Sequence, residues 1–466
     1  MTNPAGNPRA VPEGAAETIV AVSTPPGRGG IGIVRLSGPE SASIAAQLVR
    51  LRHPLEQARA RFADVLDDTE SMDAARIDEA VVTFFQAPNS YTAEDVVEIA
   101  AHGSPAVLEF LLRRAVSLGA RLADPGEFTQ RAFLSGRIDL TQAEAVRDLI
   151  EAQTLTQARQ AAGQMGGALS RRVAPVKQSL LELIALLEAG IDFAEDDIDV
   201  TPQAEIARRI AGLMPPITAL ESSFARGRIV HDGLTLAIVG RPNVGKSSLF
   251  NRLVERDRAI VTASPGTTRD LVTERISLDG IPLELVDTAG LRESLEEAEQ
   301  LGIARSREAL ADAALVLIVL DASQPLNQEE RNLLALVEGR PALVALNKSD
   351  LAGTHSATGE VADRPSISTS ALTGEGIQAL RRRLIELATS GAASEPGMLT
   401  NLRQHRAVST ARAALADAAK ANAGAIPHEM ILLDLYRVLW ALDSLTGQTT
   451  PDDILNLIFS KFCIGK

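Results

Sequence analysis

The chain has 466 residues, a formal net charge of −14 and only 3% aromatic residues. At about 150 residues per domain this length predicts about three domains, and the shortage of aromatic side chains disfavours broad stacking platforms for bare nucleic acid. A single cysteine, Cys463, excludes an intramolecular disulfide, and the longest apolar run, residues 313–320, is far shorter than the ~20 residues of a membrane-spanning helix. We therefore expect a cytoplasmic protein with no membrane association.

The N-terminal part combines a tail with short strands. Residues 1–17 contain Pro, Gly and Ala but no apolar stretch, which predicts a disordered tail and not a signal peptide. The strand-like segments TIVAV and IGIVRL then flank a Gly/Pro turn, and mixed segments follow. Residues 18–133 are therefore expected to form an α+β domain.

Long helices are predicted on both sides of a different kind of segment. In residues 134–232 apolar residues recur at three- and four-residue spacing, and helical patterns return in residues 390–466. Residues 233–389 instead contain the buried-strand runs LTLAIVG, ERISL, PLELVD, ALVLIVLD and PALVALN, which is typical of a doubly wound, mostly parallel sheet. The sequence therefore predicts a multidomain α/β plus α chain, with a helical domain interrupted by an inserted α/β domain.

A glycine-rich segment, GRPNVGKSSLF at residues 240–250, directly follows the predicted strand LTLAIV. It matches the phosphate-binding pattern G-x-x-x-x-G-K-[ST] in its strand, loop and helix context. Its two glycines allow the backbone N–H groups to curl around phosphates, the lysine can reach the β- and γ-phosphate oxygens, and the serine can bind Mg²⁺. The residues expected to contact nucleotide here are Asn243, Val244, Gly245, Lys246, Ser247 and Ser248.

Two later segments indicate that the nucleotide is GTP. Asn347, Lys348 and Asp350 follow the predicted strand PALVAL. The Asp350 carboxylate can accept both N–H donors of a guanine edge, which adenine does not present, and a site built for such a pair rejects the wrong base by roughly 10⁴-fold. Ser370 and Ala371 are expected to support the base through backbone contacts.

The segment DTAG, residues 287–290, ends another predicted strand and indicates the metal side of the site. Asp287 can hold Mg²⁺ through water, and the N–H group of Gly290 can sense a γ-phosphate. Leu291 follows, where Ras-like proteins have a glutamine that orients the attacking water. Hydrolysis is therefore expected to need another polar residue, for which Glu299 is a candidate, and a cation near the phosphates.

The motifs GRPNVGKSS, ASPGTTRD, DTAGLRES, NKSD and CIGK occur together in this chain. With them it resembles the MnmE (TrmE) tRNA-modification GTPases over nearly its whole length. The resemblance implies a folate-binding and dimerising N-terminal domain and a helical domain interrupted by a Ras-like P-loop GTPase domain. It also implies a homodimer that hydrolyses GTP with K⁺ and Mg²⁺ and forms a heterotetramer with an FAD-containing MnmG-type partner. The implied product is an aminomethyl-type group at carbon 5 of the wobble uridine of certain tRNAs.

The resemblance also assigns roles to residues of the GTPase domain. K⁺ would be bound by Asn243, Thr262, Ser264 and Thr267, and Mg²⁺ by Ser247 and Thr268. Glu299 would position the attacking water, in agreement with the need that Leu291 creates. Further nucleotide contacts would come from Ala263, Pro265, Gly266, Thr288 and Ala289.

Four residues match the folate site of this family: Arg35, Glu98, Arg137 and Lys466. Cationic side chains near a pterin-binding carboxylate suit 5-formyl- or methylene-tetrahydrofolate, whose glutamate tail is charged. From the residues alone, an edge-strand solubility charge at Arg35 and a solvated strand end at Glu98 are the favoured interpretations. Cys463 is expected to have a catalytic role near this site, with a small buried side chain as the alternative.

The resulting hypothesis is a GTPase that modifies tRNA with a folate one-carbon unit and a flavoprotein partner. A net charge of −14 argues against strong unaided tRNA binding, so the partner is expected to supply basic surface. A ribosome-assembly switch GTPase with non-catalytic flanking domains is the main alternative. A folate-dependent methyltransferase with a vestigial GTPase is a third, and the intact nucleotide motifs count against it.

Overall fold

The computed structural model describes residues 17–67, 74–192, 202–254, 273–278, 280–287, 313–351, 361, 364–389, 397–448 and 465. The chain divides into two compact units. The first contains residues 1–147, 165–167 and 442–466, and the second contains residues 148–164 and 168–441. None of the helices in the described ranges combines the length and the low polarity that crossing a bilayer requires.

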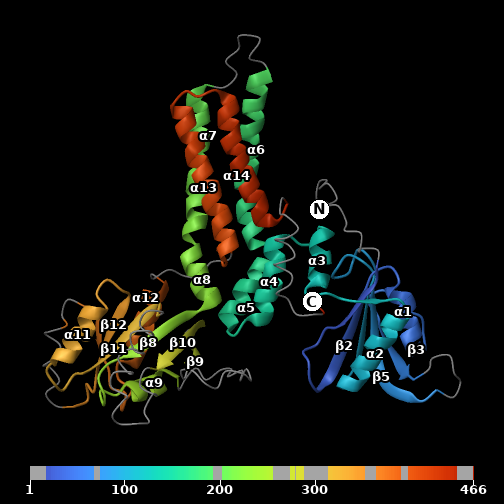
Figure 1. The fold of residues 1–466 in the computed structure, drawn as a ribbon, viewed down its shortest axis with the longest axis horizontal. Coiled ribbons are helices and arrows are strands. Elements are labelled where there is room, and N and C mark those ends of the chain that lie inside the picture. Colours follow the sequence, from blue (N-terminus) through green and yellow to red (C-terminus); the bar gives the residue numbers. More distant parts are fainter. Residues whose placement is uncertain are drawn as a thin grey trace. The chain divides into compact units, whose positions relative to one another are not determined.

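A seven-stranded sheet forms the first unit (Figure 1). Its strands are β1 (Ile19–Val22), β2 (Gly29–Ser37), β3 (Val49–Leu51), β4 (Ala60–Leu66), β5 (Arg76–Phe85), β6 (Val96–Gly103) and β7 (Arg121–Leu122). They lie in the order β3-β4-β5-β6-β2-β1-β7, and every neighbouring pair is antiparallel except β1 and β7. The side chains of β2 alternate between the two faces, so Val34 and Leu36 are buried while Arg35 lies on the other face.

Helices cover the buried face of this sheet. Residues of α1 (Ser41–Leu48) and α2 (Pro105–Ser117) share one apolar core with β2 and its neighbours. On the other face Phe128 of α3 (Glu127–Leu134) packs with Ile19 and Ala21 and with the partly buried ring of Tyr91. Helix α4 (Leu140–Glu151) begins in the first unit. Arg35 therefore lies on the α3 side of the sheet, near these two rings.

The long helices of the second unit form a bundle (Figure 1). Its helices are α6 (Ala168–Asp192), α7 (Gln203–Ser222), α13 (Leu402–Ala423) and α14 (His428–Thr446). The same unit contains the shorter helices α5 (Leu155–Met165) and α8 (Phe224–Asp232). The apolar stripe predicted in α6 is buried at Leu180, Leu183, Ile184 and Leu187. Helix α7 packs along α13, and the Asn422 amide donates to the Gln203 carbonyl over 3.2 Å. Helices from before and after the inserted sheet thus pack together, which confirms the predicted interruption.

The inserted domain contains a six-stranded sheet. Its strands are β8 (Leu234–Val239), β9 (Thr273–Leu278), β10 (Ile281–Asp287), β11 (Leu315–Asp321), β12 (Ala342–Asn347) and β13 (Ser366–Ser368). Their order is β13-β12-β11-β8-β10-β9, and only the pairing of β9 with β10 is antiparallel. The carboxyl ends of the parallel strands therefore meet at one edge.

Helices pack on both faces of this sheet. Alternate residues of β8 enter two cores, one with α9 (Lys246–Val254) and α12 (Ile377–Thr389), the other with α11 (Gln328–Leu336). Leu236 and Ile238 lie in the first core, and Ala237 and Val239 in the second. A sheet buried on both faces needs continuous apolar strands, which explains the runs in the sequence. The predicted doubly wound, mostly parallel fold is confirmed.

Candidate functional site

The phosphate loop connects the end of β8 with the start of α9. Gly245 has a φ of +94°, and a Cβ atom there would lie 2.3 Å from Nδ2 of Asn347. At Gly240 a Cβ atom would lie 2.3 Å from the carbonyl oxygen of Val319. Both positions therefore require glycine, and Asn243 adopts a left-handed φ of +64° between them. The backbone has the tight curvature that cradles phosphate groups.

Lys246 closes this loop from its helical end. Its Nζ donates to the carbonyl oxygens of Gly240 at 2.8 Å and Arg241 at 2.9 Å. The ammonium group therefore lies across the loop, where phosphate oxygens can replace these carbonyls. Ser247 and Ser248 are exposed in the first turn of α9, and the buried side chain of Val244 anchors the loop.

Asn347 joins the phosphate loop to the predicted base-binding segment. Its Nδ2 donates to the carbonyl of Val244 at 2.8 Å, and its Oδ1 accepts from the N–H of Ala371 at 3.0 Å. Asp350 accepts from the hydroxyl of Ser370 at 2.5 Å. The five predicted base-side residues, which also include Lys348, therefore lie on neighbouring loops at the carboxyl edge of the sheet.

Asp321 is a site residue that the sequence reasoning missed. It ends β11, is buried, and lies 2.7 Å from Nζ of Lys348. Burial alone raises the pKa of Asp321, but hydrogen bonds from Lys348 and Ser323 outweigh burial and lower it below its usual value. A charged carboxylate thus fixes the Lys348 side chain. The sequence does contain one indication of this residue: like Asp287, Asp321 is an acidic residue at the end of an apolar strand.

Several predicted site residues lie outside the described part of the chain. They are Thr262, Ala263, Ser264, Pro265, Gly266, Thr267, Thr268, Thr288, Ala289, Gly290 and Glu299. For Asp287 the structure describes the backbone, which ends β10 and lies opposite Ile238 of β8, two residues before Gly240. This register brings the Asp287 position to the edge that carries the phosphate loop.

The N-terminal unit brings Arg35 and Glu98 together. They are register partners on β2 and β6, and Oε1 of Glu98 lies 2.7 Å from Nη2 and 2.9 Å from Nε of Arg35. Nη1 of Arg35 also donates to the carbonyl of Gly465 at 3.2 Å. Strand β2 lies between β6 and β1, so the alternative of an edge-strand charge at Arg35 is wrong. Glu98 lies inside β6 and forms an ion pair with Arg35, so it is not a solvated strand end.

Aromatic rings complete the surroundings of Arg35. Its guanidinium carbon lies 5.8 Å from the Tyr91 ring centre and 5.6 Å from that of Phe128. Burial raises the pKa of Tyr91, and the hydrogen bond with Thr129 and the positive charges of Arg35 and Arg137 partly oppose this rise. The side chain of Arg137 is exposed. Cys463 and Lys466 lie outside the described residues.

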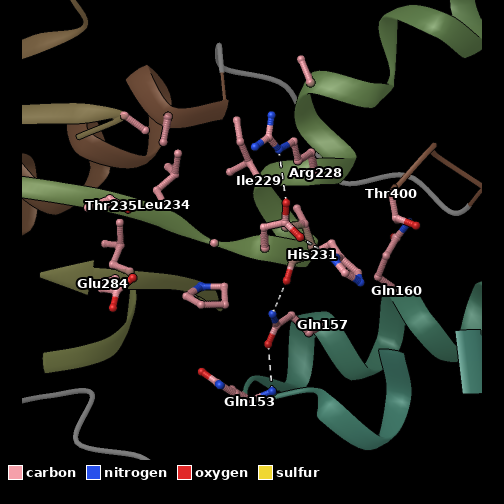
Figure 2. A pocket seen from close by; sticks show the side chains of 18 of the residues that line it. Gln153, Gln157, Gln160, Arg228, Ile229, His231, Leu234, Thr235, Glu284 and Thr400 are labelled. Carbon is pink, nitrogen blue, oxygen red and sulfur yellow. Dashed lines mark hydrogen bonds and ion pairs between the residues drawn. The ribbon is translucent and has the colours of Figure 1, made fainter. Parts of the chain in front are cut away.

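A third feature is a cavity of about 1100 Å³ in the second unit, lined by α5, α8 and the first residues of β8 and β10 (Figure 2). His231 lies there, with Nε2 3.0 Å from Asp148 and Nδ1 2.7 Å from Asp232. Hydrogen bonding and charge from Asp148, with help from Asp232, raise the pKa of His231 to about 9 despite partial burial. Gln157 donates to the His231 carbonyl at 2.7 Å. The cavity borders the start of β8, whereas the phosphate loop follows its end.

Three features lie at one edge of this doubly wound sheet: a phosphate loop that requires glycines, a lysine that lies across the loop, and a base-binding loop that carries an aspartate. Together they define a P-loop GTPase. Two family models match the chain: GTP-binding protein TrmE N-terminus over residues 18–137 and MnmE helical domain over residues 140–463. The chain belongs to the MnmE family of tRNA modification GTPases.

Curated relatives match almost the whole chain. The tRNA modification GTPase MnmE of Koribacter versatilis is 57% identical over 456 residues, covering 97% of this chain and 99% of that protein. The MnmE of Symbiobacterium thermophilum is 42% identical with the same coverage. Among solved structures, the G domain of the T. maritima FeoB iron transporter is 29% identical with a TM-score of 0.26, covering 33% of this chain and 98% of that one.

Proposed function

We propose that this chain is a K⁺-stimulated GTP hydrolase that modifies the wobble uridine of certain tRNAs at carbon 5. With an FAD-containing MnmG-type partner it adds an aminomethyl or carboxymethylaminomethyl group and uses a tetrahydrofolate one-carbon unit. The observation that supports this proposal most is the assembly of Lys246, Asn347 and Asp350 at one sheet edge of a chain whose relatives are tRNA modification GTPases.

In the GTPase half, Lys246 holds the β- and γ-phosphate oxygens and Asp350 accepts from the guanine edge. The exposed hydroxyl of Ser247 and the Asp287 position offer the oxygen ligands that Mg²⁺ prefers, so the described residues fit this ion. Bound Mg²⁺ and K⁺ neutralise charge on the phosphates. Asn243, exposed at the loop tip, offers an amide oxygen for K⁺. The remaining proposed ligands are Thr262, Ser264, Thr267 and Thr268, and Glu299 positions the attacking water.

At the proposed folate site, Arg35, Glu98, Arg137 and Lys466 bind the folate. Arg35 offers donors to a carboxylate or carbonyl, and Glu98 accepts from an N–H edge, as a pterin ring requires. The residues present fit this ligand because a charged pair, two aromatic rings and the Gly465 carbonyl lie together. 5-Formyl- or methylene-tetrahydrofolate supplies the one-carbon unit when bound, and Cys463 is proposed to act next to it.

The proposal divides these tasks among domains. Residues 18–133 bind folate and dimerise, residues 134–232 and 390–466 form the helical domain, and residues 233–389 hydrolyse GTP. The chain acts in the cytoplasm as a homodimer within a heterotetramer. Because its net charge is −14, the flavoprotein partner supplies much of the basic surface for tRNA.

Mass analysis of wobble nucleosides tests this proposal in cells that carry wild-type chain, Asp350→Asn or Cys463→Ser. Both variants should lose the modified uridine, while purified Cys463→Ser should keep GTP turnover. A switch GTPase of ribosome assembly would instead leave the nucleosides unchanged in Cys463→Ser. Turnover of GTP in K⁺ should exceed turnover in Na⁺ at matched ionic strength, and equal rates would contradict the role of K⁺.

A further inference from the structure

Arg252 connects the helix that follows the phosphate loop with the segment that supports the base. It lies in the last turn of α9. Its Nε donates to the carbonyl of Ala371 at 2.9 Å, and its Nη2 donates to the carbonyl of Leu372 at 2.8 Å. One guanidinium group therefore holds two successive carbonyl oxygens. A planar fork of donors suits this task, whereas the point charge of a lysine does not.

Apolar burial differs between the two residues that Arg252 holds: Ala371 packs partly buried against the core shared with α9 and α12, but Leu372 does not. The Leu372 side chain is 76% exposed. Two internal bonds, from the N–H of Ser370 to the Glu375 carbonyl and from the N–H of Gly374 to the Ser370 carbonyl, close the turn on itself. They fix its shape, but they do not fix its position relative to the phosphate loop. The contacts of Arg252 and Asn347 contribute to that position, together with the backbone hydrogen bonds that join Thr369 to Leu346 and Ser349.

A continuous path of hydrogen bonds leads from Arg252 to Asp350. In a trans peptide the C=O and N–H groups point in opposite directions, so holding the Leu372 carbonyl orients the N–H of Thr373. That N–H donates to Oγ of Ser370 at 3.1 Å. The Ser370 hydroxyl in turn donates to Oδ1 of Asp350 at 2.5 Å. The carboxylate that recognises guanine is therefore oriented through residues that Arg252 holds in place.

We propose that Arg252 is a positioning residue for guanine recognition, which it aligns through the Leu372 carbonyl, the Ser370 hydroxyl and Asp350. The proposal rests on the proposed GTPase function and adds a determinant of base specificity. It also ties base recognition to phosphate binding, because Lys246 and Arg252 lie on the same short helix. Arg252 touches neither the phosphates nor the base in this role.

A simpler role for Arg252 is a cation at the carboxyl end of α9, where it would interact favourably with the helix dipole. Arg252→Lys keeps that charge but loses the two-carbonyl contact, whereas Arg252→Gln loses both. Ser370→Ala breaks the path at its middle without touching α9. Arg383→Gln is the matched control, because Arg383 makes an exposed ion pair with Glu386 elsewhere in the domain.

The test compares the binding of GDP and IDP to the full-length protein with Mg²⁺, by calorimetry. IDP lacks the 2-amino group of guanine, from which Asp350 accepts a hydrogen bond. The ratio of the two dissociation constants therefore measures the contribution of this hydrogen bond. A bond to a charged group is worth about 10- to 100-fold. We expect Arg252→Gln and Ser370→Ala each to reduce the GDP preference about 10-fold, and the double variant to reduce it little further. Arg252→Lys should resemble Arg252→Gln, and Arg383→Gln should match wild type.

Equal weakening of GDP and IDP in Arg252→Gln would overturn the proposal, since it would leave only a structural role in α9. An unchanged preference in Arg252→Gln or in Ser370→Ala would also overturn it. Should Arg252→Gln fail to fold, Arg252→Lys and Ser370→Ala decide the question by the same ratio. A wild-type protein without any preference for GDP would instead refute the guanine assignment in the proposed function, so the two failures are distinguishable.

Discussion

The nucleotide loops and the Arg35 cluster assemble their side chains in different ways. Asn347 is the last residue of β12, Lys246 ends the loop that follows β8, and parallel strands bring these two strand ends to one edge. Arg35 and Glu98 are 63 residues apart and meet within strands, through the register of β2 on β6. A site at strand ends is thus encoded in short contiguous segments. A site on a sheet face depends on strand order, which no short segment encodes.

The largest effect is expected from Lys246→Ala in the phosphate loop. Removing the ammonium that lies across the loop should lower GTP turnover by about 10²- to 10³-fold, the usual loss for one stabilising donor. Phosphate release under saturating GTP measures this loss. Lys420→Ala, an exposed lysine on α13, is the control. Near-normal turnover in Lys246→Ala would contradict the assignment of the phosphate loop.

Arg35→Ala is the matching change in the second region. It leaves the half-buried Glu98 carboxylate without its partner, so binding of 5-formyl-tetrahydrofolate should weaken by about 10- to 100-fold. Calorimetry measures this affinity, and GTP turnover in the same sample should stay normal. Arg113→Ala, an exposed residue of α2, controls for loss of charge in the same domain. Unaltered folate affinity would refute the site.

Asp321→Asn tests whether the buried carboxylate at the end of β11 contributes to nucleotide binding. The change keeps the size of the side chain but removes the charge that holds Lys348, so GDP affinity should fall by about 10-fold. Fluorescent GDP displacement would show it. The surface variant Asp417→Asn on α13 should bind GDP like wild type. If Asp321→Asn also binds GDP with wild-type affinity, the carboxylate is not needed to orient Lys348.

The smallest effect is expected at His231, near the start of β8. Its folded pKa of about 9 lies above the ordinary 6.5, so its contribution to stability is complete below pH 6.5 and disappears as the pH rises through 9. The free energy of unfolding should therefore fall by roughly 1–3 kcal/mol between pH 7 and about 10. Thermal unfolding measures this slope.

His231→Gln should flatten this slope, because the titrating group is gone. His53→Gln, on an exposed segment, should keep it. Nucleotide affinity should change little across the same pH range if the two ends of β8 act independently. An identical slope in His231→Gln and wild type would show that other groups cause the pH dependence.

Most of the fold was predictable from the sequence, and so was the placement of the described nucleotide residues at one sheet edge. Apolar runs gave the strands, and the glycine at 245 is required by a positive φ that its motif implies. Arg252 was missed because its partners, two backbone carbonyls, are set by packing and leave no motif. Asp321 ends an apolar strand, as the sequence shows, but its contact with Lys348 depends on the pairing of β11 with β12. Arg35 was assigned only by resemblance. Its central position in the sheet follows from the strand order β6-β2-β1, which local patterns do not give.

The contact of Gly465 with the first sheet has a consequence for synthesis on the ribosome. The carbonyl of Gly465 accepts from Ser23 and Arg35, which precede it by 442 and 430 residues. The strands and loops of the P-loop sheet have all been translated once α12 ends at Thr389, well before Gly465 emerges. Nucleotide capture can therefore begin on a nascent chain, whereas the contacts of Ser23 and Arg35 with Gly465 form only after that residue has been translated.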